Sequence, residues 1–187
     1  TSSMGGVAFD WTLGDVWFAS VQKCFGLPAG MGIMICSPKA LEKARQVNDI
    51  LRYNSLLFVH ENFEKYQTHY TPNTLGVYLL MRVMEQMEPI AAIDQQTVRR
   101  AESLYQFIEN ETDWEPLVTT NATRSDTVIA VKGEPQAIAA LKKEATLAGI
   151  TLGNGYGEWK NNTFRIANFP AINDEEIAQL KSFLQKI

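Results

Sequence analysis

Short apolar runs separated by turn residues open the chain. Residues 15–21 (DVWFASV) and 31–36 (MGIMIC) are rich in β-forming side chains, and a loop rich in glycine and proline separates them. We expect two buried strands that flank this loop. Ser37 and Pro38 then supply an N-cap and a proline at the first helical position, which predicts a helix over residues 38–47.

The middle of the chain has a less regular pattern. Residues 48–73 are mixed in character and predict a long surface or interface loop that stops at Thr71-Pro72, because a residue before proline disfavours helical angles. Residues 74–87 are apolar on most faces, which predicts a deeply buried helix. Residues 94–110 repeat apolar side chains at helical spacing and place charges opposite, so we expect an amphipathic helix there.

The last third of the chain predicts a compact unit of strands and helices. A strand over residues 126–132 precedes a helix over residues 135–148, which Gly149 closes. Two short strands follow, around residues 150–152 and 163–168. A final helix starts at Asn173, with Glu176 completing a capping box, and extends to Ile187. The order is β-α-β-β-α, and the fold class is α/β.

Composition excludes several classes of protein. The 187 residues are 45% hydrophobic and carry a net charge of −4, without the basic block that nucleic acid requires. No apolar run reaches the ~20 residues of a membrane span. Cys24 and Cys36 have no metal or redox spacing, and His60 and His69 lack nearby ligands, so we expect no metal and a cytoplasmic setting. The first residues lack an initiator Met, and we interpret them as the interior of a longer chain.

Three residues are candidates for chemistry. Lys23 follows an apolar run directly; it is either a surface lysine at a strand end or an amine of the kind that condenses with an aldehyde. Arg165 stands between Phe164 and Ile166, where its guanidinium needs an anion, either a structural partner or a bound carboxylate. Thr71 is a cap or turn residue, or a phosphate ligand.

Three segments in order carry a resemblance to a known family. They are WFASVQKCFGLPAGMGIMICS at 17–37, YTPNT at 70–74 followed by LGVYLL, and TFRIAN at 163–168. The chain resembles class V, fold-type I aminotransferases that depend on pyridoxal 5'-phosphate, and most closely the phosphoserine aminotransferase branch. The resemblance implies that residues 1–90 form the C-terminal portion of the cofactor-binding large domain, and that residues 91–187 form a small C-terminal α/β domain.

The resemblance also implies the role of each residue. Lys23 forms the Schiff base with the cofactor and moves the proton, while Gln22 lies beside the cofactor. Thr71 reaches the cofactor phosphate of the partner subunit, which implies a homodimer with shared sites. Arg165 binds the substrate carboxylate. The implied reaction exchanges an amino group between an amino acid and a 2-oxo acid.

Departures from the family pattern leave alternatives open. Phosphoserine aminotransferases carry a His-Arg pair before the carboxylate arginine, whereas residues 155–160 (GYGEWK) have none, and Glu158 would repel a phosphate. An alanine- or serine-glyoxylate aminotransferase therefore remains possible. So does a noncatalytic structural fragment, because the family's cofactor aspartate and phosphate loop would lie before Thr1. A cysteine desulfurase or lyase would need a reactive cysteine.

A further motif, Gly153-Asn154-Gly155-Tyr156-Gly157, superficially resembles a dinucleotide fingerprint. It lies between two predicted short strands, with no helix after it. We therefore interpret it as a hairpin or flexible loop.

Overall fold

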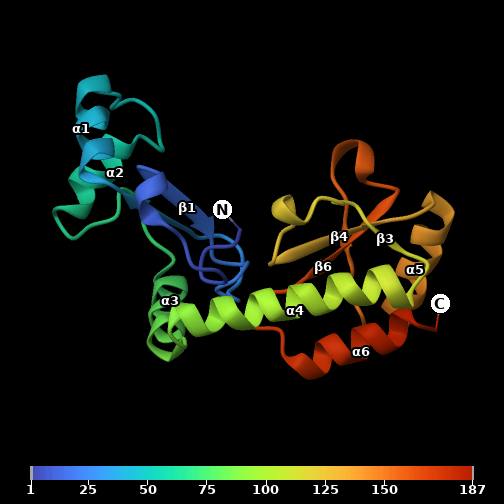
Figure 1. Cartoon of the computed structure of the whole chain (residues 1–187). Helices are drawn as coiled ribbons and strands as arrows, with labels where there is room; N and C mark the ends of the chain where they lie inside the picture. The colour runs from blue at the N-terminus through green and yellow to red at the C-terminus, as the bar shows by residue number, and fades with distance from the viewer. Residues whose placement is uncertain (1, 187) are drawn as a thin grey trace. The chain divides into compact units, whose positions relative to one another are not determined.

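The chain divides into two compact units in a computed structural model that describes residues 2–186 (Figure 1). Within the described residues, unit 1 contains the residues up to Met4 and Phe9–Met87, and unit 2 contains Gly5–Ala8 and the residues from Glu88 onward. Ile187, where we expected the last helix to end, lies outside the described residues. Within residues 2–186, no helix combines the length and the apolar composition that a bilayer crossing requires.

Unit 1 is built on a two-stranded antiparallel sheet with three helices after it in the sequence. Val16 on the first strand pairs with Cys36 on the second, and Ser20 pairs with Gly32. The Ser37 hydroxyl accepts a hydrogen bond from the backbone N–H of Ala40 at 3.1 Å, so the predicted N-cap and helix are confirmed. The elements are η1 (Trp11–Leu13), β1 (Val16–Ser20), β2 (Gly32–Cys36), α1 (Pro38–Val47), α2 (Leu56–Phe63) and α3 (Thr74–Gln86).

Helix α2 corrects the prediction of a continuous loop over residues 48–73. Ser55 caps this helix by accepting a hydrogen bond from the backbone N–H of Phe58 at 3.3 Å. Leu57 provides its one buried side chain among the described residues. A serine directly before an apolar run is an N-cap signal, but the short helix buries too little for its periodicity to stand out.

The predicted burial of the strands and of residues 74–87 is wrong. Ala19 is the one buried residue among the described strand residues of β1 and β2, and none of the described residues of α3 is buried. Residues 74–86 therefore form the expected helix, but no described element buries their apolar side chains. The core of unit 1 is a small cluster formed by Met4, Ala19, Val21 and Phe25, with partly buried neighbours that include Trp17, Leu80 and Met87.

Unit 2 is a four-stranded antiparallel sheet with three helices. The strand order is β3-β4-β6-β5, so β6 lies between β4 and the short edge strand β5. The strands expected over residues 126–132 and 163–168, the helix before Gly149 and the final helix are present. The short strand expected around residues 150–152 lies instead at residues 153–154, and β3 is an addition. The elements are α4 (Ile90–Glu111), β3 (Glu115–Pro116), η2 (Asn121–Thr123), β4 (Val128–Lys132), α5 (Pro135–Leu147), β5 (Gly153–Asn154), η3 (Gly157–Trp159), β6 (Thr163–Ala167) and α6 (Asp174–Leu184).

One face of this sheet carries the core of unit 2. Ile129 pairs with Ile166 and Val131 with Phe164, and all four side chains are buried. Because side chains alternate along a strand, these four point to the same face, where they meet buried apolar residues of all three helices. The helix residues in this cluster are Ala101, Leu104, Tyr105, Phe107 and Ile108 of α4, Ile138 and Leu141 of α5, and Ile177, Leu180 and Leu184 of α6.

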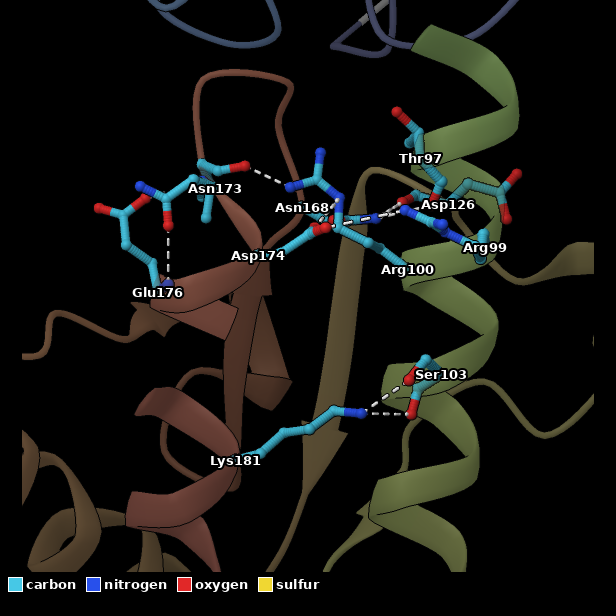
Figure 2. Close-up of polar contacts among 11 residues, drawn as sticks. Thr97, Arg99, Arg100, Ser103, Asp126, Asn168, Asn173, Asp174, Glu176 and Lys181 are labelled. Carbon is cyan, nitrogen blue, oxygen red and sulfur yellow. Dashed lines mark hydrogen bonds and ion pairs between the residues drawn. The ribbon is translucent and has the colours of Figure 1, made fainter. Parts of the chain in front are cut away.

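Polar contacts join helices α4 and α6, which run side by side (Figure 1). The ammonium of Lys181 donates to the hydroxyl of Ser103 at 2.7 Å. Arg100, almost fully buried, donates to the carbonyl of Ile172 and lies 3.8 Å from the carboxylate of Asp174. The capping box that we expected at the start of α6 is present (Figure 2).

Asn168 connects the end of β6 to two other segments (Figure 2). Its side-chain amide donates to the carbonyl of Thr97 in α4 at 2.9 Å and to the carbonyl of Asp126 before β4 at 2.7 Å. Its backbone N–H donates to the carbonyl of Thr127 at 2.9 Å. Asn168 is fully buried, so these hydrogen bonds are shielded from water.

Replacing Asn168 by alanine is therefore expected to destabilise unit 2. The change removes the hydrogen bonds to the carbonyls of Thr97 and Asp126 from a buried position, which costs about 1–3 kcal/mol. Urea denaturation followed by circular dichroism measures this loss. The exposed Asn161 provides the control, because Asn161→Ala removes an amide of the same kind from the surface. Equal unfolding midpoints for the two variants would contradict the prediction.

Candidate active site

Lys23 lies in a tight turn that follows β1. The carbonyl of Lys23 accepts a hydrogen bond from the N–H of Gly26 at 2.9 Å, and the carbonyl of Val21 accepts one from Leu27 at 3.1 Å. Val21, Cys24 and Phe25 are buried, so the turn is anchored by side chains on both sides of the lysine. Lys23 itself is half-buried, and within residues 2–186 its ammonium has no hydrogen-bond or ion-pair partner. Gln22 is exposed in the same turn.

The start of the chain lies beside this turn. The thiol of Cys24 donates to the carbonyl of Ser2 at 3.3 Å. Burial raises the pKa of the Cys24 thiol to about 12, and it also raises the pKa of Cys36. Neither sulfur is thus a ready nucleophile. Among the described residues, no group of three His, Cys, Asp or Glu side chains is placed to hold a metal ion.

Thr71 is exposed in the loop before α3. Asn73 caps that helix by accepting a hydrogen bond from the N–H of Gly76 at 3.0 Å. A cavity of about 150 Å³ is bounded on one side by the loop after Lys23 and on the other by the start of α3. The segments that hold two of the predicted cofactor residues therefore adjoin one cavity. Its lining residues include Val21, Leu27, Pro28, Asn73, Gly76 and Leu79.

Arg165 belongs to unit 2 and lies on the face of the sheet opposite the core. Its neighbours on the strand, Phe164 and Ile166, are buried, whereas Arg165 is half-buried. The Nε of Arg165 donates to the carbonyl of Asn154 at 2.6 Å, and the guanidinium lies 4.4 Å from the centre of the Tyr156 ring. Within residues 2–186, neither Nη atom has a hydrogen-bond or ion-pair partner. One edge of the guanidinium is thus open to an anion.

Two glycines in residues 153–157 occupy positions that other residues would not fit. Gly155 is buried, and a Cβ there would overlap the hydroxyl of Thr163 and the carbonyl of Trp159. Gly157 has a φ of +56°, which favours glycine. The glycines therefore allow the backbone to place Asn154 and Tyr156 against Arg165. The motif was expected to lie between two strands, but its first two residues form strand β5 itself, and the residues after them lead into η3 before β6 begins.

Lys142 of α5 adds a second positive charge near Arg165. Its ammonium donates to the side-chain oxygen of Asn154 at 2.9 Å and to the carbonyl of Thr163 at 3.1 Å. Burial, and then the charge of Arg165, lower the pKa of Lys142. The two cations are thus close enough to repel each other.

Sequence reasoning missed Lys142, Asn154 and Tyr156 as site residues. Lys142 has the ordinary pattern of a helix surface, and nothing in the local sequence links it to Arg165, which lies on a strand later in the chain. Asn154 and Tyr156 stand in a motif that we had singled out for its glycines. An aromatic residue between glycines, shortly before a strand arginine, was the signal available.

Known proteins resemble this chain in both fold and sequence. No protein-family model matches it. The phosphoserine aminotransferase of Rhodococcus opacus is 32% identical over 188 residues, covering 96% of this chain and 50% of that protein. A solved phosphoserine aminotransferase from Cytophaga hutchinsonii superposes with a TM-score of 0.88 at 32% identity, covering all of this chain and 53% of the other. An alanine–glyoxylate aminotransferase from Nostoc shares the fold alone, with a TM-score of 0.86 at 20% identity over 99% of this chain and 51% of that one.

The fold is that of the class V aminotransferases, and the predicted resemblance is confirmed. Within that class the sequence is phosphoserine aminotransferase-like over nearly its whole length. The chain spans about half the length of the curated relatives that it matches.

The two thiols are expected to differ in reactivity toward iodoacetamide. With a pKa of about 12, roughly one Cys24 thiol in 10⁴ is ionised at pH 8, and the thiolate is the reactive form. Cys36 is less buried and should react first, while Cys24 should react only after unfolding in urea. Peptide mapping by mass spectrometry measures both. Faster labelling of Cys24 in the native protein would contradict this and would revive the desulfurase hypothesis.

Proposed function

We propose that this chain provides part of a pyridoxal 5'-phosphate-dependent aminotransferase that is most like phosphoserine aminotransferase. The observation that carries the proposal is the sequence match over 96% of the chain, which includes the segments around Lys23, Thr71 and Arg165. The reaction exchanges an amino group between an amino acid and a 2-oxo acid. In this proposal unit 1 is part of the cofactor-binding domain, and unit 2 is the small domain.

The residues around Lys23 fit the cofactor. A half-buried lysine without an anionic partner in the described structure, in a turn fixed by buried neighbours, presents an amine in a defined place. Pyridoxal phosphate, when bound, supplies an aldehyde that takes up the amino group and a ring that withdraws electrons from the substrate's α-carbon. Lys23 would hold the cofactor through its amine, and its Nζ would move the proton from the substrate's α-carbon to the C4′ carbon of the cofactor. Gln22 lies beside the cofactor.

The remaining roles concern the phosphate and the substrate. Thr71 offers a hydroxyl in an exposed loop, which suits a phosphate that belongs to a partner subunit. We therefore include a homodimer in the proposal. Arg165 binds the substrate carboxylate through its open Nη edge, where two parallel hydrogen bonds give both strength and orientation. Both cysteines are free, which suits a reducing, cytoplasmic setting.

The identity of the amino donor has a second candidate. Glu158 lies in η3, directly after the loop that contacts Arg165, and its negative charge disfavours a phosphorylated substrate nearby. This residue favours an alanine- or serine-glyoxylate aminotransferase. Steady-state rates with phosphoserine and 2-oxoglutarate, compared with alanine or serine and glyoxylate, distinguish the two.

Lys23 is expected to be the one site of covalent cofactor attachment. The longest native form of the protein is incubated with pyridoxal phosphate, reduced with borohydride and mapped by mass spectrometry. An adduct confined to Lys23 is the expected result, and Lys23→Ala should abolish both the adduct and transamination. Lys39→Ala, which removes an exposed lysine of α1, is the control and should retain both. Scattered adducts, or turnover in the Lys23→Ala variant, would favour the noncatalytic structural fragment.

Replacing Arg165 by lysine is expected to weaken substrate binding. Lysine keeps the charge but loses the planar fork, so the Michaelis constant should rise about tenfold to a hundredfold. Steady-state kinetics over a range of amino acid concentrations measure this change. Arg124→Lys is the control, because Arg124 is bound to Glu109 and to the carbonyl of Val118 within unit 2. An unchanged Michaelis constant in Arg165→Lys would remove Arg165 from the substrate site.

A further inference from the structure

Lys142 connects helix α5 to the two strands that surround Arg165. Its ammonium donates to the side-chain oxygen of Asn154 in β5 at 2.9 Å and to the carbonyl of Thr163 in β6 at 3.1 Å. Thr163 is itself fixed, because its hydroxyl donates to the carbonyl of Trp159 at 2.6 Å. The lysine thus binds both ends of the segment that leads from β5 to β6.

Asn154 is shared between Lys142 and Arg165. Its side chain accepts from Lys142, and its backbone carbonyl accepts from the Nε of Arg165 at 2.6 Å. A movement of the Asn154 side chain is transmitted to its own backbone, and therefore to the guanidinium. The same loop carries Tyr156, whose ring lies 4.4 Å from the guanidinium carbon.

The short edge strand explains why this support is needed. β5 consists of Gly153–Asn154 and pairs with β6 alone, so few ladder hydrogen bonds hold it in register. A strand of two residues with a glycine has little stability of its own. Helix α5 is packed into the core through Ile138 and Leu141. The hydrogen bond from Lys142 of this helix therefore holds the side chain of Asn154 in place.

We propose that Lys142 is a positioning residue for Arg165, acting through Asn154, so that the Nη edge of the guanidinium is held ready for the substrate carboxylate. This role rests on the proposed function of Arg165. It gives the Gly153–Gly157 motif a purpose, which is to bring a carbonyl and an aromatic ring against the arginine.

The test compares Lys142→Met with Lys143→Met in the longest native form of the protein. Lys143 is the next residue on α5 and is exposed. Lys142→Met should raise the Michaelis constant for the amino acid about fivefold to tenfold, because a displaced guanidinium loses alignment with the carboxylate. The turnover number and the absorbance of the bound cofactor should stay unchanged. Lys142→Arg should restore most of the binding, and Lys143→Met should match the wild type.

An equilibrium measurement removes the dependence on turnover. Titration calorimetry with 2-hydroxyglutarate, a carboxylate without an amino group, should show the same five- to tenfold weakening in Lys142→Met. If that variant does not fold, as judged by circular dichroism, Asn154→Ala provides the test. It removes the acceptor of Lys142 but keeps the carbonyl that binds Arg165, and it should weaken binding to the same extent.

A double-mutant cycle identifies the route of the effect. If Lys142 acts through Arg165, Lys142→Met should change the Michaelis constant little in an Arg165→Lys background. Additive effects of the two substitutions would overturn the positioning role. An unchanged Michaelis constant in Lys142→Met, with Arg165→Lys impaired, would overturn this role and leave the proposed function intact. A wild type without borohydride adduct or transamination would overturn both.

Discussion

The buried amide of Asn168 is the contact on which the arrangement of unit 2 depends. It joins the end of β6 to helix α4 and to the segment before β4 (Figure 2). Because β6 lies between β4 and β5, its register determines where the residues of both neighbours lie. Arg165 stands three residues before Asn168 on the same strand. The hydrogen bonds that stabilise the sheet therefore also fix the backbone of the substrate-binding candidate.

Side chains that alternate along β6 place the core residues on one face of the sheet and the candidate substrate-binding residue on the other. Phe164 and Ile166 fill the core on one face, while Arg165 lies on the other. The strand is thus held by its neighbours in sequence, and Arg165 needs no structural anion of its own. What remains to be fixed is the direction of its side chain. The carbonyl of Asn154 in β5 binds its Nε, and in the role proposed for Lys142 this residue acts on the guanidinium through Asn154.

Local signals in the sequence predicted much of the fold. The Ser37 cap, the Asn173 capping box and Gly149 each depend on contacts with residues nearby in the sequence. The helices that begin or end at these residues are therefore present as expected. Burial depends on what covers an element, and the apolar pattern of α3 contains no information about its neighbours. The candidate residues came from short motifs. Lys142 could not be predicted as a site residue from the sequence, because Asn154, which it contacts, lies 12 residues later on a different secondary-structure element.

Electrostatics suggest why Lys142 and Arg165 are kept close together. Two cations that repel each other cost free energy, and the lowered pKa of Lys142 reflects both its burial and this repulsion. An anion bound at the guanidinium would offset the repulsion, so the pair stabilises the liganded state more than the free one. The proposed effect of Lys142 on carboxylate binding is nevertheless exerted through Asn154, whose carbonyl holds the Nε of Arg165.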